Sequence, residues 1–332
     1  MEIQVMKSFR LLITVCLCTS LLFSCKWLKK DESEVVVVEE TLERPDFSPD
    51  SAYEYVAKQV AFGPRVPGLP AQKACFDYLK EKMTQFGAQV TVQEAKLNIY
   101  NGKEVPMFNL IASFNPDIEK RILLCAHWDS RPFADQDTAK RNLPIDGAND
   151  GASGVAVLME IARQLNIKKP DVGVDIIFFD VEDYGQPDGD GDHVEDSYAL
   201  GTQYWAKNPH KPNYTAENGI LLDMVGAGDA LFTMEGISMQ YAPEFNRKVW
   251  NIAIQMGYAD YFNFRMTESI IDDHYYINKI AAIPTIDIIH KDLNTASGFW
   301  KYWHTHEDNL SKIDKNTLKV VGETVLATVY DF

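Results

Sequence analysis

The stretch Ile145–Leu165, IDGANDGASGVAVLMEIARQL, decides the fold. It begins as a loop in which Gly147 and Gly151 allow the chain to bend sharply. It continues as a helix, whose apolar residues recur at helical spacing: Val155, Leu158, Met159 and Ala162. Asp150 lies at the junction, where a carboxylate could simply cap the helix. The surrounding sequence favours a chemical role instead.

Further histidine and carboxylate residues follow strand-like runs elsewhere in the chain. The segment AHWD (126–129) follows one apolar run, VED (181–183) follows a second, and Asp223 follows a third. The segment WHT (303–305) lies near the end. Such donors at the ends of successive strands are what a zinc site at the mouth of an α/β sheet needs.

The same apolar runs indicate the fold class. Dense runs at 121–126 and 174–179 are typical of strands buried on both faces. We also expect strands at 90–95, 108–114, 220–225 and 283–289, and helices at 71–86, 154–165, 201–206, 242–256 and 316–329. Another helix follows Pro49, with Asp50 or Ser51 as its cap. The alternation predicts a single α/β domain with a mostly parallel central sheet flanked by helices on both faces.

Composition restricts the partners of the protein. The formal net charge of −16 argues against nucleic acid as a partner. Glycine-rich phosphate loops and dinucleotide fingerprints do not occur in a convincing strand–helix context. The chain is long enough to bury one large core, because 46% of its 332 residues are hydrophobic.

The N-terminus reads as a targeting segment. Lys7 and Arg10 precede the apolar stretch Leu11–Phe23, which ends in LFSC (22–25), a sequence that resembles a bacterial lipobox. We therefore expect a lipoprotein signal peptide at 1–24, a lipid on Cys25 that attaches the protein to a membrane, and an acidic tether at 25–45. The catalytic domain would span 46–332, in the periplasm or on the outer membrane of a bacterial cell envelope. Ordinary secretion with cleavage nearby is the alternative.

Two of the five cysteines belong to the expected mature domain. Cys75 falls on a predicted helix and Cys125 on a predicted central strand. A disulfide between these positions needs close approach of the two elements. We expect two small buried apolar side chains instead.

Taken together, these residues resemble the zinc-dependent aminopeptidase superfamily, and most closely its glutaminyl-peptide cyclotransferase branch, over about 62–310. The superfamily pattern comprises His127, Asp129, Asp150, Glu182, Asp183, Asp223 and His304. Four matches are narrower and favour the cyclase: FGPRVPG (62–68), DSYALGTQYWA (196–206), DDH (272–274) and Trp303 directly before His304.

The resemblance implies a set of metal ligands and a base. Asp150, Asp183 and His304 would hold one zinc per chain and leave a fourth position open for catalysis. Glu182 would act as general acid and base. Animal cyclases usually have glutamate at the position of Asp183, whose side chain is one methylene shorter.

The resemblance also implies how the rest of the pocket is built. Asp223 and Asp272 would share hydrogen bonds and retain one proton between them, because two carboxylates in contact do not both ionise cheaply. Trp303, with Phe299 and Trp300, would form the wall of the substrate pocket, although aromatic core packing is the alternative for the latter two.

The implied activity is that of an acyltransferase which converts the N-terminal glutamine of peptides and proteins to pyroglutamate and releases ammonia. Two other functions stay open. His127, Asp150 and Asp223 would be second-metal ligands in a two-zinc aminopeptidase, with Asp129 orienting His127. A surface-tethered binding protein without catalysis is the third, and it is disfavoured because every ligand and the base are present.

An acidic segment at 188–196 looks calcium-like but lacks the final glutamate of an EF-hand, since Ala199 stands there. We expect a flexible acidic lid there rather than a calcium site.

Overall fold

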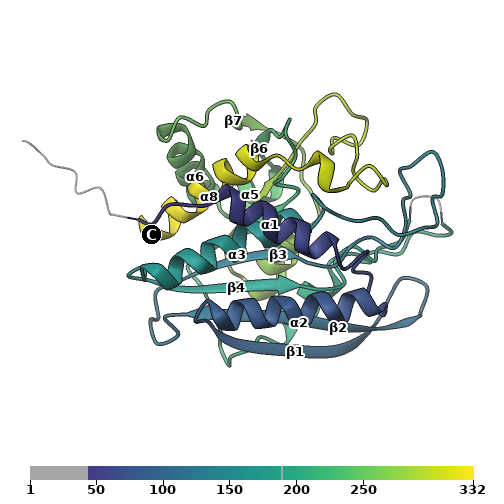
Figure 1. Cartoon of the computed structure of the whole chain (residues 1–332), viewed down its shortest axis with the longest axis horizontal. Helices are drawn as coiled ribbons and strands as arrows, with labels where there is room; N and C mark the ends of the chain where they lie inside the picture. The colour runs from purple at the N-terminus through teal and green to yellow at the C-terminus, as the bar shows by residue number, and fades with distance from the viewer. Residues whose placement is uncertain (1–43, 188–189) are drawn as a thin grey trace, which may run out of the picture. The chain divides into compact units, whose positions relative to one another are not determined.

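The centre of the structure, a computed structural model (Figure 1), is a six-stranded sheet. Its strand order is β1-β2-β4-β3-β5-β8. The structure describes residues 44–187 and 190–332, so the expected signal peptide, Cys25 and nearly all of the tether lie outside it. The strands are β1 (Gln89–Asn98), β2 (Glu104–Phe114), β3 (Arg121–His127), β4 (Gly173–Phe179), β5 (Asn218–Asp223) and β8 (Thr285–Ile289).

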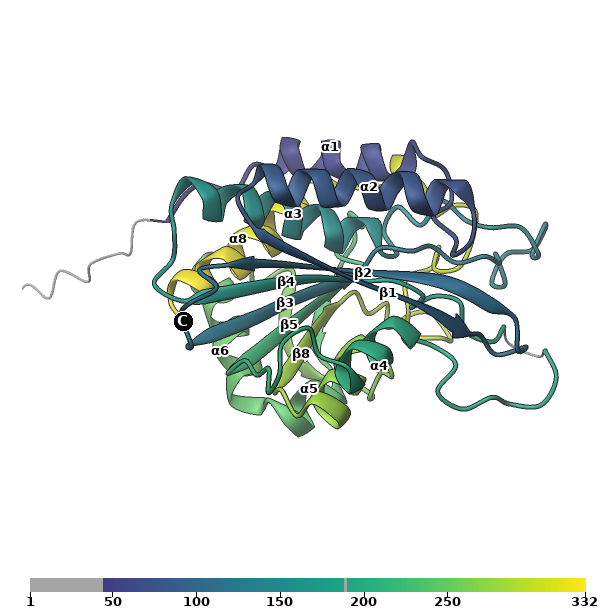
Figure 2. The ribbon, with the colours of Figure 1, turned by 90° about the horizontal axis from the view of Figure 1, so that it is seen from below.

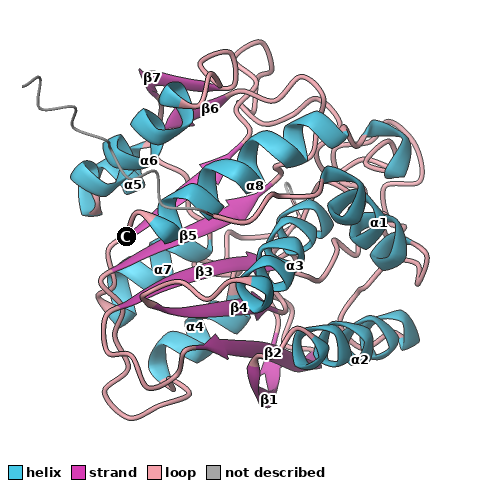
Figure 3. Cartoon of the chain, turned by 60° about the vertical axis from the view of Figure 1, so that its left-hand side comes forward, coloured by secondary structure: helices cyan, strands magenta, loops and turns pink. Residues whose placement is uncertain are grey.

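The strands that carry the predicted donors run in one direction. β4, β3, β5 and β8 are parallel to one another, whereas β1 and β2 pair antiparallel and close one edge (Figure 3). The expected mostly parallel sheet is confirmed. Because the carboxyl ends of parallel strands meet at one edge, the segments after β3, β4 and β5 converge there.

Helices cover both faces of this sheet, since successive side chains of a strand point to opposite sides (Figure 2). In β3, Leu124 belongs to the large cluster under α3, and its neighbour Leu123 belongs to the cluster under α4. One face carries α1 (Pro49–Val60), α2 (Pro70–Gln85), α3 (Ala152–Ile167) and α8 (Lys315–Tyr330). The other carries α4 (Leu200–Lys207) and the π-helix η1 (Ile277–Ala281).

Several short elements escaped the sequence analysis. They are β6 (Phe232–Met234), α5 (Gly236–Tyr241), β7 (Phe262–Met266), α7 (Asp273–Tyr276) and the 3-10 helix η2 (Leu310–Lys312). β6 pairs with β7 in a separate two-stranded sheet, and α5 contacts β8. The predicted helix near 242–256 is α6 (Pro243–Gln255), which contacts α8.

The start of α1 corrects one prediction. Neither Asp50 nor Ser51 is the cap, because Ser48 takes that position and its hydroxyl accepts a hydrogen bond from the Ser51 amide at 3.2 Å. Pro49 explains the difference, since proline is favoured at the first helical position and the cap is the residue before it.

The loop before α3 places its carboxylate without using it as a cap. Gly151 occupies the cap position of α3, and no side chain there bonds the first turn. Gly147 has a φ of +57°, as its predicted role in the bend requires. Gly151 serves close approach instead, because a Cβ on it would lie 2.6 Å from the Cε1 atom of His127. The start of α3 therefore lies in direct contact with His127 at the end of β3.

Cys75 and Cys125 are both free and fully buried, as expected. Within 44–187 and 190–332 no helix combines the length and the apolar content that a membrane crossing needs.

Candidate active site

A cavity of about 260 Å³ opens at the carboxyl edge of the parallel strands. Eight of the predicted site residues line it: Asp150, Glu182, Asp183, Asp223, Asp272, Phe299, Trp303 and His304. They come from the loop before α3, the segment after β4, the end of β5, the start of α7 and the loop before η2. Residues that lie up to about 150 positions apart in the chain therefore meet in one place.

The predicted ligand set is assembled at the base of this cavity. Single donor atoms of Asp150, Asp183 and His304 all lie within 4.8 Å of one another, and all three residues are buried. The Nε2 atom of His304 is 3.2 Å from Asp183 Oδ1 and 3.7 Å from Asp150 Oδ2. Asp183, although shorter than glutamate, thus reaches the set. Its Oδ2 atom is buried without a hydrogen-bond partner, as expected of a carboxylate oxygen that binds a metal ion.

A second set of donors shares Asp150. His127 Nε2 lies 3.0 Å from Asp150 Oδ1 and 3.3 Å from Asp223 Oδ1. These three residues also form a buried group that could hold a metal ion. Oxygen and imidazole donors in this number and spacing fit zinc at either position. The geometry therefore allows one metal ion, or two that are bridged by Asp150.

A buried ion pair supports the first set from behind. Arg131 binds both oxygens of Asp135 at 2.7 Å and also contacts Asp183 Oδ1 at 3.3 Å. Asp135 in turn lies 3.2 Å from the Nδ1 atom of His304. A carboxylate on the far nitrogen of a ligand histidine fixes the orientation of its ring. The sequence analysis missed this pair, because Arg131 and Asp135 carry no motif of their own.

Asp129 fixes the backbone of the segment that carries Glu182 and Asp183. Its carboxylate accepts hydrogen bonds from the backbone amides of Glu182 and Asp183, at 3.1 and 3.2 Å, and lies 3.6 Å from His127 Nδ1. One buried side chain therefore fixes the end of β3 to the segment that follows β4. Asp129 lies near His127, as predicted, but beyond hydrogen-bond distance, and its hydrogen bonds go to the backbone.

Asp308 and Arg65 are two further residues that the sequence analysis missed. Asp308 accepts the amides of Asn149 (2.8 Å) and Asp150 (3.1 Å), so it holds the backbone of the loop before α3. Arg65, the arginine of FGPRVPG, donates to the carbonyls of Trp128 and Gly147 from the other side, at 3.0 and 2.7 Å. The motif was noticed, but its backbone contacts could not be read from the sequence.

Glu182 faces the cavity beside the ligands. Its side chain is 12% exposed, and its Oε2 atom lies 4.0 Å from His127 Nδ1. Burial raises the pKa of Glu182 well above its usual value, and the nearby Asp183 carboxylate adds to the rise. A carboxylate whose pKa is moved toward neutrality is suited to take up and return a proton at physiological pH.

Asp223 and Asp272 both line the cavity, but the expected hydrogen bond between them is not among the contacts of the described residues. Asp223 pairs with His127, and Asp272 caps α7 by accepting the amide of Asp273 at 2.5 Å. Burial raises the pKa of Asp223 to about 7, with contributions from Asp150 and Asp272. Burial and the neighbouring carboxylates therefore favour the protonated form of Asp223, whereas a proton shared between Asp223 and Asp272 stays a prediction.

A buried polar cluster lies behind Asp272. His274 Nε2 is 3.0 Å from Glu235 Oε1, and its Nδ1 atom is 3.8 Å from Asp287 Oδ2. All three side chains are inaccessible to solvent. Asp272, His274 and Asp287 also form a group with metal-ligand spacing. His274, the histidine of the DDH motif, therefore contacts Glu235 and Asp287 and does not line the cavity.

The aromatic wall is partly as predicted. Trp303 stacks on the ring of His304 with centroids 3.7 Å apart, and Phe299 packs on Trp303 at 4.6 Å. Trp300 does not line the cavity: it is buried in the apolar cluster against which Phe299 and Trp303 pack, and its indole nitrogen donates to Asp229 at 3.2 Å. The expectation for Trp300 is wrong, and the alternative of core packing holds.

Three residues at or next to the site have left-handed backbone. Val181, Met224 and His304 all have positive φ values, of 56°, 49° and 55°. Left-handed backbone is unfavourable for non-glycine residues, and above all for a β-branched one such as Val181. Each of these residues is a site residue or directly adjoins one, so the strain sets the direction in which Glu182, Asp223 and His304 point.

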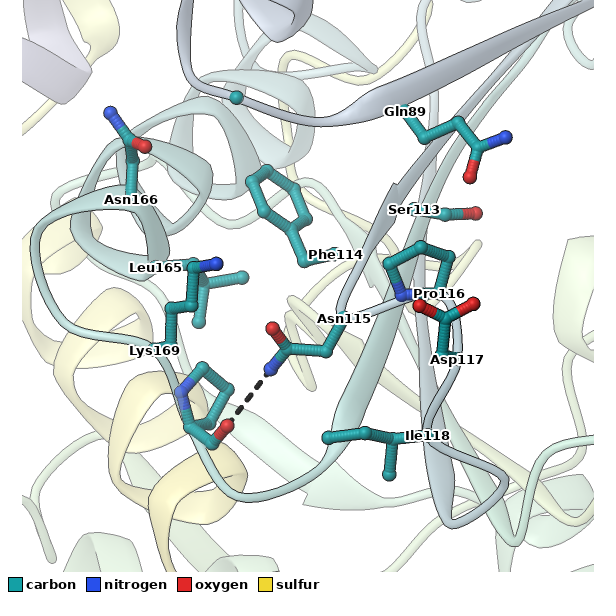
Figure 4. Close-up of a pocket in the computed structure, with 12 residues that line it drawn as sticks. Gln89, Ser113, Phe114, Asn115, Pro116, Asp117, Ile118, Leu165, Asn166 and Lys169 are labelled. Atoms are coloured by element: carbon teal, nitrogen blue, oxygen red, sulfur yellow. Dashed lines mark hydrogen bonds between the residues drawn. The ribbon is translucent and has the colours of Figure 1, made fainter.

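Another pocket, of about 370 Å³, lies at the opposite edge of the sheet (Figure 4). It is formed between the segment 114–118 after β2 and the end of α3, where the Asn115 amide donates to the Pro170 carbonyl at 2.9 Å. It contains none of the predicted site residues. Among the described residues, the groups that could hold a metal ion include no residue of 190–196 in the acidic segment.

A mostly parallel α/β sheet whose carboxyl edge carries paired carboxylate–histidine donor sets and an adjacent free glutamate defines a class: zinc-dependent enzymes of the aminopeptidase-like kind. The chain belongs to peptidase family M28, whose model matches residues 109–329.

Similar proteins are described either as zinc-dependent exopeptidases or as glutaminyl cyclases. A zinc-dependent exopeptidase from Parabacteroides distasonis is 52% identical, with a TM-score of 0.86 over 87% of this chain and 100% of that one. A glutaminyl cyclase from Tannerella forsythia is 51% identical, with a TM-score of 0.85 and the same coverage. The glutaminyl-peptide cyclotransferase of the snake Boiga irregularis is 25% identical, covering 81% of this chain and 77% of the relative.

Proposed function

We propose that the protein is a glutaminyl-peptide cyclotransferase, which converts N-terminal glutamine to pyroglutamate and releases ammonia. The observation that carries the proposal is the cavity that joins the ligand set Asp150, Asp183 and His304 to the largely buried base Glu182. The 51% identity with a solved glutaminyl cyclase supports the same reaction.

The reaction is an intramolecular transfer, and the residues divide its tasks. Zinc held by Asp150, Asp183 and His304 would supply a Lewis acid for the side-chain amide of the substrate. Glu182 takes a proton from the α-amine as its nitrogen bonds to the amide carbon. Glu182 then returns the proton to the departing nitrogen, which leaves as ammonia when the carbon–nitrogen bond breaks. One bond forms, one breaks, and no other reactant is consumed.

The walls supply orientation. Trp303 and Phe299 form an apolar surface of two contacting rings on one side of a cavity of about 260 Å³. A space of this size encloses a single residue, so it favours a glutamine side chain that is folded back toward its own amine. Holding the two reacting groups together removes much of the entropic barrier to ring closure.

We further propose one zinc ion per chain. All three ligands of the first donor set line the catalytic cavity, whereas His127, which the second set needs, does not line it. Elemental analysis of protein purified without chelators should give about one zinc per chain. A zinc content close to two per chain would overturn the one-zinc proposal. Calcium found in the same measurement would contradict the expectation that the acidic segment 188–196 is not a calcium site.

A two-zinc aminopeptidase is the second candidate, and the observation that favours it is the intact His127, Asp150 and Asp223 set. The discriminating experiment offers one peptide that begins with glutamine and one that begins with leucine. Ammonia release without shortening of the glutamine peptide supports the cyclase. Release of a free amino acid from either peptide would show the peptidase instead.

The expected location is a separate proposal, which rests on the N-terminal sequence alone. We propose that Cys25 carries a lipid that attaches the enzyme to a membrane of the bacterial envelope, where exported peptides and proteins with N-terminal glutamine would be its substrates. Metabolic labelling with a radioactive fatty acid tests it: wild type should incorporate label and Cys25→Ala should not. Equal labelling of both would contradict it.

A further inference from the structure

A groove of about 560 Å³ adjoins the catalytic cavity. Its walls are the segment 190–198, together with Gln186 and Pro187, and the region of α7. Tyr198 and Ile271 line both the groove and the catalytic cavity, so the two spaces share one rim. Ile271 is 63% exposed on that rim, an unusual position for a large apolar side chain. The shared rim makes the groove a continuation of the active site.

The groove is acidic. Asp190, Glu195 and Asp196 line it, and all three are exposed. Asp196 is fixed in place because the hydroxyl of Tyr276 donates to its Oδ1 atom at 2.9 Å. The one lysine among the described lining residues, Lys279, is engaged by the phenol of Tyr275 at 2.9 Å. The formal charge of the lining is therefore negative.

The direction of a bound peptide follows from the chemistry of the proposed function. The α-amine and side chain of the first residue are consumed at the base of the cavity, so the remaining residues must leave through its mouth. An extended chain advances about 3.3–3.6 Å per residue. The second to fourth residues of a bound peptide therefore pass over the rim that the cavity and the groove share. Ile271 and Tyr198 offer apolar contact there, and the carboxylates lie beyond them.

We propose that this groove binds the residues that follow the N-terminal glutamine and selects peptides with lysine or arginine at positions two to four. The inference rests on the proposed cyclase function. Charge complementarity and continuity with the catalytic cavity carry it, and no metal ion in the acidic loop is needed. Exposed charge pairs contribute modestly and are weakened by salt, so the preference is a matter of several-fold and is largest at low ionic strength.

The test compares two peptides that differ only at positions two and three, Gln-Lys-Lys and Gln-Glu-Glu, each followed by the same neutral sequence. The zinc-loaded enzyme should give a kcat/KM at least about threefold higher for the basic peptide at low salt. Glu195→Lys should bring this ratio close to one, and Glu195→Gln should give an intermediate value. Glu119→Lys is the matched control, because Glu119 is exposed just before β3, at the opposite end of the sheet.

Equal ratios in wild type, Glu195→Lys and Glu119→Lys would overturn the proposal. Binding of the same peptides, labelled at their C-termini, to zinc-loaded Glu182→Gln gives the ratio without turnover. If the peptides are shortened rather than cyclised, the proposed function fails, while the binding ratio still decides the groove. If cyclisation occurs with no preference between the peptides, only the groove proposal fails.

Discussion

Replacing Glu182 by glutamine isolates the proposed base from the metal site. The Glu182 side chain lines the cavity and is 12% exposed. It belongs to neither of the two metal-donor sets at the carboxyl edge of the sheet. Its backbone amide is held by Asp129 at 3.1 Å, an interaction that a side-chain substitution leaves intact. Glutamine has nearly the same shape but does not accept a proton at physiological pH. The variant should therefore fold, bind zinc and fail at proton transfer.

The size of the loss follows from the role. A positioned general acid–base typically contributes about 10²–10⁴ in rate, which is about 2.7–5.4 kcal/mol of transition-state stabilisation at 1.36 kcal/mol per factor of ten. We expect kcat for a glutamine peptide to fall by about this factor. KM should change little, because the Trp303 and Phe299 wall is untouched.

The assay follows ammonia release in parallel with the zinc content of each sample. Asp183→Asn is the comparison variant, since it alters a proposed ligand next to Glu182 in the chain and should lose zinc together with activity. A Glu182→Gln enzyme with kcat close to that of wild type would refute the assignment of the base. Loss of zinc from this variant would show that Glu182 is a ligand.

Three further predictions concern the metal and stability. Removal of zinc with a chelator should abolish activity, and added zinc should restore it; activity that survives verified removal would contradict the mechanism. Asp175→Asn breaks the buried pair with Arg121 (2.7 Å), so chemical denaturation should show about 3–5 kcal/mol less stability with kcat unchanged, whereas equal stability would count against the pair. Burial opposes ionisation of Glu235, but the His274 hydrogen bond lowers its pKa to about 2 from 4.5. Because the pKa is lower in the folded state, ionised Glu235 stabilises the fold fully above pH 4.5, and this stabilisation is lost as the pH falls toward 2. Glu235→Gln should therefore lower the free energy of unfolding by about 3 kcal/mol at pH 7 in denaturant titrations. The difference in stability between the variant and wild type should shrink below pH 4.5.

The sheet could be predicted because its strands are buried on both faces. β3 and β4 are buried along their whole length, and apart from Arg121, His127 and Asp175 their residues are apolar or glycine, a pattern typical of central parallel strands. The antiparallel edge strands and α3 followed from ordinary periodicity. β6, β7 and α7 are only three to five residues long, too short for periodicity to reveal.

The convergence of the donors could also be predicted, because parallel strands deliver their carboxyl ends to one edge. Residues at or just beyond the end of a strand are then more informative than those within it, as the positions of His127, Asp183 and Asp223 show. The assignment of roles to Glu182 and Asp183 came from family resemblance rather than from spacing.

The supporting interactions could not be predicted. Asp308 and Arg65 act on backbone amides and carbonyls of a loop that is distant in the chain, and backbone partners leave no residue pattern. The departure of Trp300 from the wall reflects its packing in a buried apolar cluster, which its proximity to Trp303 in the sequence does not reveal. Likewise, the positive φ of Val181 and His304 reflects tertiary packing that overrides local preference.

The central claim is that the working cation sits on Asp150, Asp183 and His304 rather than on the set that contains His127. The most direct measurement is the zinc content of His304→Ala and His127→Ala, purified side by side with wild type. Each substitution removes one imidazole from one set and leaves the shared Asp150 in place. We expect His304→Ala to lose its zinc and His127→Ala to keep about one ion per chain. Retention of zinc by His304→Ala, or its loss from His127→Ala alone, would contradict the account.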